Sequence, residues 1–278
     1  TPGDGGIATL DWQGNGVQAM NLGLTSATLF EINGFRFKDN GNSTTSYLVV
    51  STGGGTFKRC KFQDAAATAV YAVYANFEEC EAENWGRRTG WQYGFFPYYG
   101  SMRDCYAHDA APGCSAPAYV GNRGLHLGCI AARAEYGFGG GQWGITYVNC
   151  DAYDCHHSGW FLDGGTTTKH LINCNAVNCG SFGFRVYNAS AQARLHNCGS
   201  YGNGLGRITE APCVEDINPI AYSRMPYRDP DNGDFTLVTP EAIGQGYQAF
   251  LDPSIVTGYP DVGAISPRRT YDLRSLRA

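Results

Sequence analysis

The sequence predicts an all-β solenoid, in which short parallel strands stack in successive coils. Segments centred on cysteine recur at a nearly fixed period, and the residues around each cysteine alternate between small and polar types. The composition agrees with this class, because 38 glycines are about twice the usual share and charged residues make up only 16% of the chain. With 278 residues, the chain is long enough to bury a core without disulfides or metals.

Seven cysteines mark the repeat. They follow one another at steps of 20, 25, 24, 21, 24 and 24 residues, and an earlier copy fits if Phe35 takes the place of the cysteine. A constant period in this range is typical of solenoids, whose repeats bury their apolar faces against one another. The seven cysteines are Cys60, Cys80, Cys105, Cys129, Cys150, Cys174 and Cys198.

Each copy is expected to form a short strand that ends in a turn. The residue two positions after the cysteine is mostly small, as in Ala82, Ala107 and Ala152, and its neighbours are mostly polar. This period-two alternation places the cysteine and the small residue inside the coil. Four positions after the cysteine comes Asp or Asn in most copies, for example Asp64 and Asn84, and these residue types favour turns.

A second apolar patch recurs midway through the coils, where Gly94-Phe95, Gly137-Phe138, Gly159-Trp160 and Gly183-Phe184 align. Coils of 20 to 25 residues with two or three short strands resemble the right-handed parallel β-helix, the fold of pectate-lyase-like enzymes and of many phage tailspikes. The resemblance covers about residues 7–205 and implies eight to nine coils. It implies a connection with carbohydrates only by analogy, because one fold hosts many functions.

Three regions of one domain follow from the repeat. We expect β-helix coils over residues 1–206, an irregular C-terminal cap over 207–267 that covers the last coil, and a basic tail over 268–278. "DPDNGDFTLVTPEAIGQG" and "DVGAISP" resemble the closing segment of bacterial secreted and phage-type β-helix proteins. The start resembles a chain that begins inside the fold, so we expect a missing segment or a partner to cover the N-terminal end.

The cysteines have three possible roles: disulfides, a metal site or core packing. Equivalent positions in stacked coils lie ~4.8 Å apart, slightly beyond the usual Cβ separation of a disulfide, so mostly reduced and buried thiols are predicted. A zinc site from Cys150, Cys155, His156 and His157 would need inward and outward groups to converge, so no metal is predicted there. The pairing of Cys114 and Cys213 stays open.

Charge and hydropathy exclude two classes of partner. The net charge of −5 comes without a basic stripe, which argues against nucleic acid. No run of about 18 apolar residues occurs, so no membrane span is predicted.

The densest charged surface comes from three successive coils. The positions one before, one after and three after each cysteine are expected to point outward. In the coils of Cys60, Cys80 and Cys105 these positions form a charged grid, which we predict to hold catalytic and binding residues. Two carboxylates side by side could serve as acid and base at a sugar carbon, and a lysine, arginine, histidine or tyrosine could remove a proton in an elimination. The competing interpretation is a ladder of ion pairs, Arg59 with Glu79 and Lys61 with Glu81. The predicted catalytic residues are Glu79, Glu81, Asp104 and His108, and the predicted binding residues are Arg59, Lys61, Glu83 and Tyr106.

The longest segment near this grid, "NWGRRTGWQYGFFPYYG", is rich in aromatic residues, whose flat rings suit the faces of sugars. Two arginines in it could pair with an anionic sugar. The residues predicted to bind substrate here are Trp85, Arg87, Arg88, Trp91, Tyr98 and Tyr99. No cofactor is required, although the glutamates of the grid could hold Ca²⁺.

Two functions from different classes fit these observations. The first is an extracellular, secreted or virion-surface protein that binds a polysaccharide or cell-surface glycan along its outer face and, as a lyase or glycoside hydrolase, could cleave it. The second is a non-catalytic structural or adhesive module, such as a virion spike or decoration protein. Oligomeric state separates them, since spikes of this fold are commonly homotrimers and secreted lyases are usually monomers.

Overall fold

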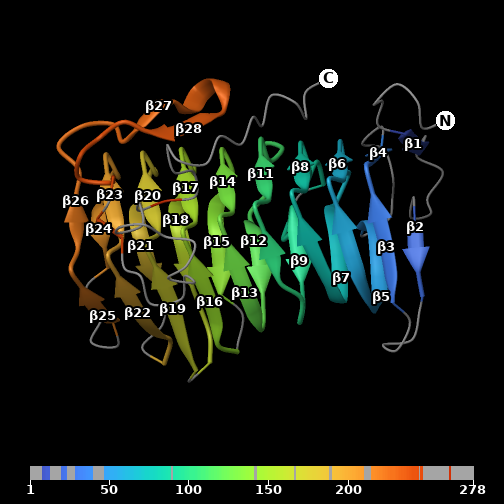
Figure 1. Ribbon diagram of the computed structural model, residues 1–278, viewed down its shortest axis with the longest axis horizontal. Coiled ribbons are helices and arrows are strands. Elements are labelled where there is room, and N and C mark those ends of the chain that lie inside the picture. Colours follow the sequence, from blue (N-terminus) through green and yellow to red (C-terminus); the bar gives the residue numbers. More distant parts are fainter. Residues whose placement is uncertain are drawn as a thin grey trace, which may run out of the picture.

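The structure is a computed structural model, and it confirms the predicted all-β parallel solenoid (Figure 1). It describes residues 8–12, 20–23, 29–39, 47–88, 90–140, 143–165, 167–187, 190–209, 214–243, 245–246 and 263. The predicted basic tail and Cys213 lie outside these residues. No helix among them is long and apolar enough to cross a membrane.

One face of the solenoid is a ten-stranded parallel sheet with one short strand from each coil. Its strands are β1 (Ala8–Trp12), β4 (Phe35–Asp39), β6 (Lys61–Gln63), β8 (Glu81–Glu83), β11 (Tyr106–His108), β14 (Ile130–Ala132), β17 (Asp151–Tyr153), β20 (Asn175–Val177), β23 (Gly199–Tyr201) and β26 (Ile220–Ala221). Phe37 pairs with Phe62 and Phe62 with Ala82, so Phe35 occupies the place of the cysteine, as the repeat predicts.

Sixteen further strands form one large sheet that bends around the solenoid in two rows. The second row contains β2 (Met20–Leu22), β9 (Phe95–Pro97), β12 (Pro117–Gly121), β15 (Tyr136–Gly140), β18 (Ser158–Leu162), β21 (Phe182–Val186) and β24 (Gly206–Ile208). The third row contains β3 (Phe30–Asn33), β10 (Met102–Arg103), β13 (Gly124–Leu127), β16 (Ile145–Val148), β19 (Thr168–Ile172), β22 (Gln192–His196) and β25 (Val214–Ile217). The long strands β5 (Tyr47–Lys58) and β7 (Thr68–Glu78) run through both rows.

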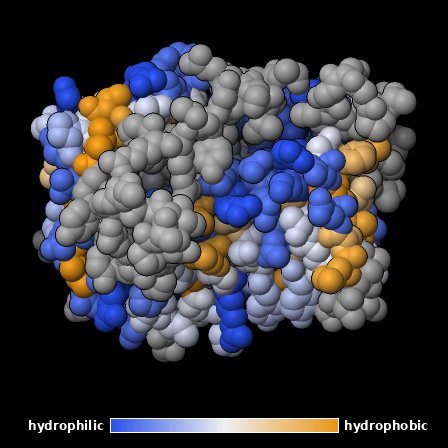
Figure 2. Space-filling model, in the orientation of Figure 1, coloured by the Kyte–Doolittle hydropathy of each residue, from blue (hydrophilic) through white to orange (hydrophobic). Residues whose placement is uncertain are grey.

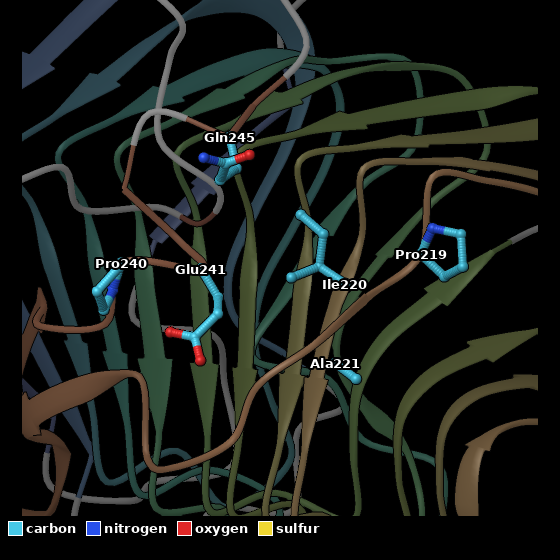
Figure 3. A pocket seen from close by; sticks show the side chains of 6 residues that line it. All are labelled: Pro219, Ile220, Ala221, Pro240, Glu241 and Gln245. Carbon is cyan, nitrogen blue, oxygen red and sulfur yellow. The ribbon is translucent and has the colours of Figure 1, made fainter.

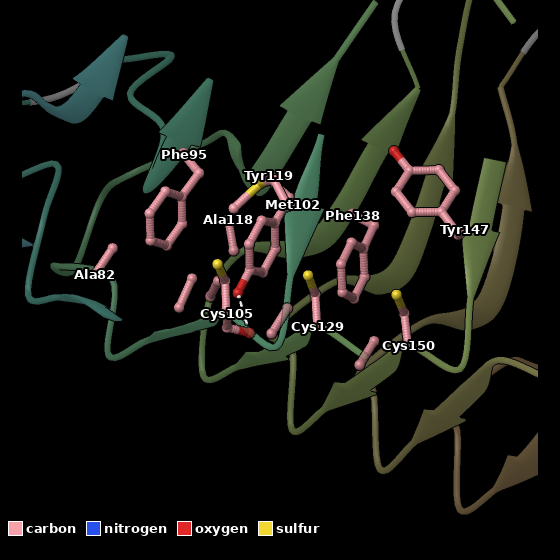
Figure 4. Close-up of a cluster of buried hydrophobic side chains, with 14 of the residues drawn as sticks. Ala82, Phe95, Met102, Cys105, Ala118, Tyr119, Cys129, Phe138, Tyr147 and Cys150 are labelled. Atoms are coloured by element: carbon pink, nitrogen blue, oxygen red, sulfur yellow. Dashed lines mark hydrogen bonds between the residues drawn. The ribbon is translucent and has the colours of Figure 1, made fainter. Parts of the chain in front are cut away.

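The core consists of columns of equivalent residues (Figure 4). Tyr119 stacks on Phe95 and Phe138 with ring centroids 5.4 and 4.8 Å apart, and its hydroxyl donates to the Cys105 carbonyl at 2.8 Å. The seven repeat cysteines are buried beside this stack, and each of the ten cysteines that the structure describes is a free thiol. Cys114, whose role was open, donates to the Gln92 carbonyl at 3.0 Å.

Left-handed corners flank each short strand from β6 to β23. Glu79, Asp104, Asn149 and Asn173 precede their cysteines with φ of 52°, 53°, 51° and 55°. Asp64, Asn84, Asp109 and Asp154 follow their strands with φ of 59°, 54°, 58° and 48°. Asp and Asn tolerate this region better than most residues, which explains the polar types that recur at both corners.

The C-terminal region differs from the expectation in two ways. The coils continue past residue 206, because β24, β25 and β26 pair with β21, β22 and β23. The next segment contains the antiparallel pair β27 (Tyr227–Asp229) and β28 (Asp234–Leu237), joined by the 3-10 turn η1 (Pro230–Asn232). It packs on the outer face of the ten-stranded sheet rather than only on the last coil, since Tyr227 and Phe235 contact Tyr153 there.

Candidate functional site

A charged cluster lies on the outer face of the ten-stranded sheet, next to the part of that face on which β27 and β28 pack. In the three-residue strands the middle side chain, such as Ala82 or Ala107, lies in the core, so the first and third point outward. Where the C-terminal segment covers this face, Ile130, Ala132, Tyr153 and Val177 supply its apolar part, although the buried polar residues Asp151 and Asn175 also lie there. Tyr106, against Phe235, lies at the boundary. The charged cluster consists of Lys61, Glu81, Glu83, His108, Asp109 and Arg133.

Lys61 and the two glutamates form the first half of the charged cluster. Lys61 Nζ lies 3.2 Å from Glu81 Oε1 and 2.6 Å from Glu83 Oε2. The ion pair predicted between Lys61 and Glu81 is therefore present, and both residues are buried, with 8% and 4% exposure. Burial alone would raise the pKa of Glu81, but the hydrogen bond from His108 and the charge of Lys61 together hold that pKa below its usual value.

His108 joins this half to the second half of the charged cluster, which consists of Asp109 and Arg133. Its Nε2 lies 2.8 Å from Glu81 Oε1, and its Nδ1 lies 2.6 Å from Asp109 Oδ2. Burial lowers the pKa of His108, yet the two carboxylates outweigh burial and raise it above the ordinary value. Arg133 holds Asp109 from the other side through Nε and, at 3.2 Å, through Nη2. Asp109 therefore has a lowered pKa despite its partial burial.

These electrostatics constrain the chemistry of the charged cluster. A general acid needs a carboxyl pKa above its ordinary value, whereas the pKa values of Glu81 and Asp109 lie below it. His108, with its raised pKa, is the group suited to give a proton. Burial raises the pKa of the adjacent Tyr106 to about 12, so this phenol stays protonated and can donate a hydrogen bond.

The donor set does not favour calcium. Glu81, Glu83 and His108 place three ligand atoms within 4.8 Å of one another. The Lys61 ammonium, however, lies between the two glutamates at ion-pair distance from each, and Ca²⁺ prefers six to eight oxygen ligands. The charged cluster is therefore a poor site for Ca²⁺.

Three predicted site residues lie at corners, not on the sheet. Arg59, Glu79 and Asp104 have φ of 50°, 52° and 53° and precede the strands that carry Lys61, Glu81 and Tyr106. Arg59 donates to Asn33 Oδ1 at 3.0 and 2.9 Å, in place of the expected pairing with Glu79. The prediction assumed period-two alternation through the cysteine, but the left-handed corner interrupts it.

The aromatic-rich segment is divided among three environments. Trp85 is fully buried in the core, where it cannot contact a ligand. Arg87 pairs with Asp64 at 3.0 Å, and Arg88 is exposed beside it. Tyr98 and Tyr99 lie in the turn between β9 and β10, the corner that does not border the ten-stranded sheet.

Trp91 belongs to a second outward surface, which sequence reasoning missed. Its ring contacts Phe161, three coils further on, with centroids 6.4 Å apart, and Tyr187 also contacts Phe161, with centroids 5.1 Å apart. Trp91 and Tyr187 are 56% and 58% exposed. On the same row of strands, Tyr71 contacts Phe96 at 5.2 Å. We call Tyr71, Trp91, Phe96, Phe161 and Tyr187 the aromatic face.

Arg185 borders the aromatic face. Its guanidinium lies 5.9 Å from the Phe161 ring and 5.4 Å from the Tyr187 ring, and it contacts His157 Nε2 at 3.1 Å. Burial and the charge of Arg185 lower the pKa of His157, which favours the neutral imidazole. A signal existed in the sequence: Phe96, Phe161 and Arg185 each follow the inward aromatic residue of the aligned second patch.

Cys150, Cys155, His156 and His157 do not converge on a metal. Both cysteines are buried in the core, whereas His156 is exposed and His157 faces Arg185.

Among the described residues, polar and apolar side chains gather in separate patches on the side seen in Figure 2.

A hollow at the other end of the molecule is lined by Pro219, Ile220, Ala221, Pro240, Glu241 and Gln245 (Figure 3). It lies between β26 and the segment after β28, far along the ten-stranded sheet from β8 and β11. Glu241 accepts a hydrogen bond from Ser223 at 2.6 Å. One paired carboxylate offers no arrangement for acid and base chemistry.

Comparisons with known proteins agree with this architecture. The crystal structure of pectate lyase Pel9A is similar with a TM-score of 0.58 and 13% identity, over 93% of this chain and 86% of that one. The catalytic domain of a GH87 alpha-1,3-glucanase in complex with tetrasaccharides has a TM-score of 0.49 and 12% identity, over 76% of this chain and 59% of that one. No curated protein matches the sequence.

At such identities, the likeness to the pectate lyase shows the fold alone. The family model described as "right handed beta helix region" matches residues 46–210, which are more than half of the sequence and include most of the stacked coils. The chain therefore belongs to the right-handed β-helix family.

Proposed function

We propose that this protein binds a polysaccharide along the outer side of its coils, with the aromatic face as the principal contact surface. The observation that carries the proposal is the exposure of Trp91 and Tyr187, which both contact Phe161. The C–H groups on the face of a sugar ring pack favourably on the electron-rich face of an aromatic ring. Trp91 and Tyr187 are exposed and both pack on Phe161, and an exposed apolar patch of this kind marks an interaction surface.

The repeat geometry supports a long ligand over a small one. Trp91 belongs to the coil of Cys80 and Tyr187 to the coil of Cys174, so the aromatic face extends along the solenoid axis. Extended surfaces of this kind suit polymers. The pectate lyase reported above acts, as its name says, on the polysaccharide pectate, and it has a similar fold. Such polymers lie outside cells, so the proposal places the protein there or on a virion surface.

The charged cluster supports cleavage as a second candidate function. His108 is held between the carboxylates of Glu81 and Asp109, which orient its ring, and its raised pKa favours a protonated imidazole that could give a proton to a leaving group. The reaction would be hydrolysis or elimination at a glycosidic bond. The rival is a rigid, non-catalytic module in which the same cluster only joins neighbouring coils.

Affinity electrophoresis in gels that contain one polysaccharide each tests binding. We expect at least one glycan of a neutral and acidic panel to retard the protein, and Trp91→Ala and Tyr187→Ala to weaken retardation about tenfold, as loss of a stacking contact predicts. Leu205→Ala is the control, because Leu205 is 66% exposed and is not part of the aromatic face. Equal retardation of all four proteins would contradict the aromatic face as the binding surface.

The same panel tests cleavage through new reducing ends and through the ultraviolet absorbance of unsaturated products. Turnover that His108→Ala abolishes would establish an enzyme that uses the charged cluster. Binding without turnover on every glycan would favour the non-catalytic module.

A further inference from the structure

We infer that another surface, distinct from the aromatic face and located at the corner between the second and third strand rows, recognises the acidic groups of a glycan chain. Four consecutive coils each place one aromatic or guanidinium group there. We call Tyr74, Tyr99, Arg123 and Trp143 the corner row. The three rings are exposed, with 45%, 40% and 41% exposure, and Arg123 is exposed as well.

The groups of the corner row contact one another in the order of their coils. Tyr74 stacks on Tyr99 with centroids 5.5 Å apart and planes 19° apart. Arg123 lies 6.0 Å from the centroid of Tyr99 and 4.6 Å from that of Trp143. The row is continuous and spans three coil steps, roughly 14 Å by the spacing of strands.

Glycines make this corner compact and fix the spacing of the row. A Cβ on Gly100 would lie 1.8 Å from the Ala75 carbonyl oxygen, and one on Gly124 would lie 2.3 Å from the Gly100 carbonyl oxygen. Asn76 reinforces the turn, since its Oδ1 accepts from the Ser101 amide at 2.9 Å and from the Ser101 hydroxyl at 2.8 Å. Tight backbone contacts therefore hold Tyr99 and Arg123 on neighbouring coils.

The charge of Arg123 identifies the class of ligand. Its side chain forms no ion pair with any residue that the structure describes, and no Asp or Glu occurs in the segments 73–76, 98–101, 121–124 and 140–144. The flanking rings hold the guanidinium plane and leave its N–H groups to a partner from solution. A planar guanidinium pairs best with a carboxylate or a sulfate in two parallel hydrogen bonds.

A glycan fits the corner row better than a protein partner does. The row is one side chain wide and is bordered by glycine and small polar residues, whereas stable protein interfaces bury about 800 Å² on each partner. It adjoins the aromatic face through Tyr98, which contacts Tyr99 at 4.6 Å and Phe96 at 6.1 Å. The inference thus extends the proposed function to acidic glycans and rests on it.

Affinity electrophoresis with matched glycan pairs tests the inference. Polygalacturonate and its methyl ester differ in carboxylate charge, and dextran sulfate and dextran differ in sulfate charge. We expect the charged member of at least one pair to retard the protein more than the uncharged member does. In Arg123→Gln and Trp143→Ala, the ratio of the two affinities should fall about tenfold, as expected for loss of a charge-assisted hydrogen bond. Arg194→Gln is the matched control, because Arg194 is exposed but already paired with Glu215.

The outcomes separate this inference from the proposed function. If Arg123→Gln binds the acidic glycans like the parent while Trp91→Ala does not, the corner row is not a site and the aromatic face stands. If Trp91→Ala binds like the parent while Arg123→Gln does not, the corner row stands and the aromatic face fails. Equal binding of charged and uncharged members, or a dimer that Trp143→Ala abolishes in solution-mass measurements, would overturn the acidic-glycan assignment.

Discussion

His108 Nε2 lies 2.8 Å from Glu81 Oε1 on the neighbouring strand, and both side chains are about 95% buried. This contact joins the coil of Cys80 to the coil of Cys105 through a charge pair. Its strength depends on protonation, because only a protonated imidazole donates to Glu81 and Asp109 at the same time.

The raised pKa of His108 makes part of the stability depend on pH. The folded protein holds this proton more tightly than the unfolded chain, whose histidine titrates near 6.5. The contribution is therefore complete below about pH 6.5 and is lost as the pH rises through the folded-state pKa. Urea unfolding of the parent and of His108→Gln between pH 5 and 9 checks this. The difference in unfolding free energy should shrink as the pH rises, and a difference that is constant with pH would contradict it.

Lys61 is expected to matter through the charge that it neutralises. Lys61→Met would leave Glu81 buried with one partner fewer, so we expect a loss of about 3 kcal/mol in unfolding free energy. The double variant Lys61→Met/Glu81→Met removes both charges and should recover part of that loss. A double-mutant cycle from urea unfolding measures the coupling. Additive effects of the two substitutions would show that the pair contributes no mutual stabilisation.

The sequence predicted the strand positions better than the corners. The repeat correctly placed Ala82 inside and Glu81 outside, because alternation holds within a three-residue strand. It misplaced Glu79, because this residue itself forms the left-handed corner before the strand, and alternation does not continue through such a corner.

Two other features could not be predicted from the repeat, because they arise from contacts between distant parts of the chain. Trp91 reaches Phe161 across three coils, which spacing alone does not reveal. The C-terminal segment covers the sheet from Ile130 onward, and a change from charged to apolar outward residues at Ile130 and Ala132 was the available signal.

The corner assignment of Glu79 is testable by substitution with asparagine. Asparagine tolerates the left-handed region better than glutamate does, and other coils already use it at this corner, as at Asn173. We expect Glu79→Asn to raise the unfolding free energy by about 0.5–1 kcal/mol and to leave glycan binding unchanged. Glu81→Asn is the contrast, because it disrupts the charged cluster and should destabilise the fold. Loss of turnover in Glu79→Asn on a cleaved glycan would restore Glu79 as a catalytic residue.

His126 should limit stability in acid. It is fully buried against Tyr119 and Tyr147, neither ring nitrogen has a hydrogen-bond partner among the described residues, and burial lowers its pKa to about 3. The unfolded chain takes up the proton near pH 6.5, so stability is complete above that pH and falls as the pH drops from 6.5 toward 3. The loss is on the order of 4 kcal/mol over that range.

Replacement of His126 with leucine separates this effect from general acid denaturation. Leucine removes the two unpaired nitrogens, so His126→Leu should match or exceed the parent at pH 7 and should lose less stability at pH 5. Urea unfolding at the two pH values measures both quantities. A variant that is less stable than the parent at both would show that the imidazole makes a stabilising contact.

The thiols provide a test of the core as a whole. The ten cysteines within the described residues are buried free thiols, and burial raises the pKa of those in the main column, such as Cys105, Cys129 and Cys150, well above the ordinary value. Only a thiolate attacks a disulfide reagent, so these thiols should not react with Ellman's reagent in the native protein at pH 8. Unfolding in guanidinium should release all ten in one cooperative step, because each coil is packed between its neighbours. Rapid reaction of several thiols before the unfolding transition would mean that the coils separate locally, and would contradict a continuously packed core.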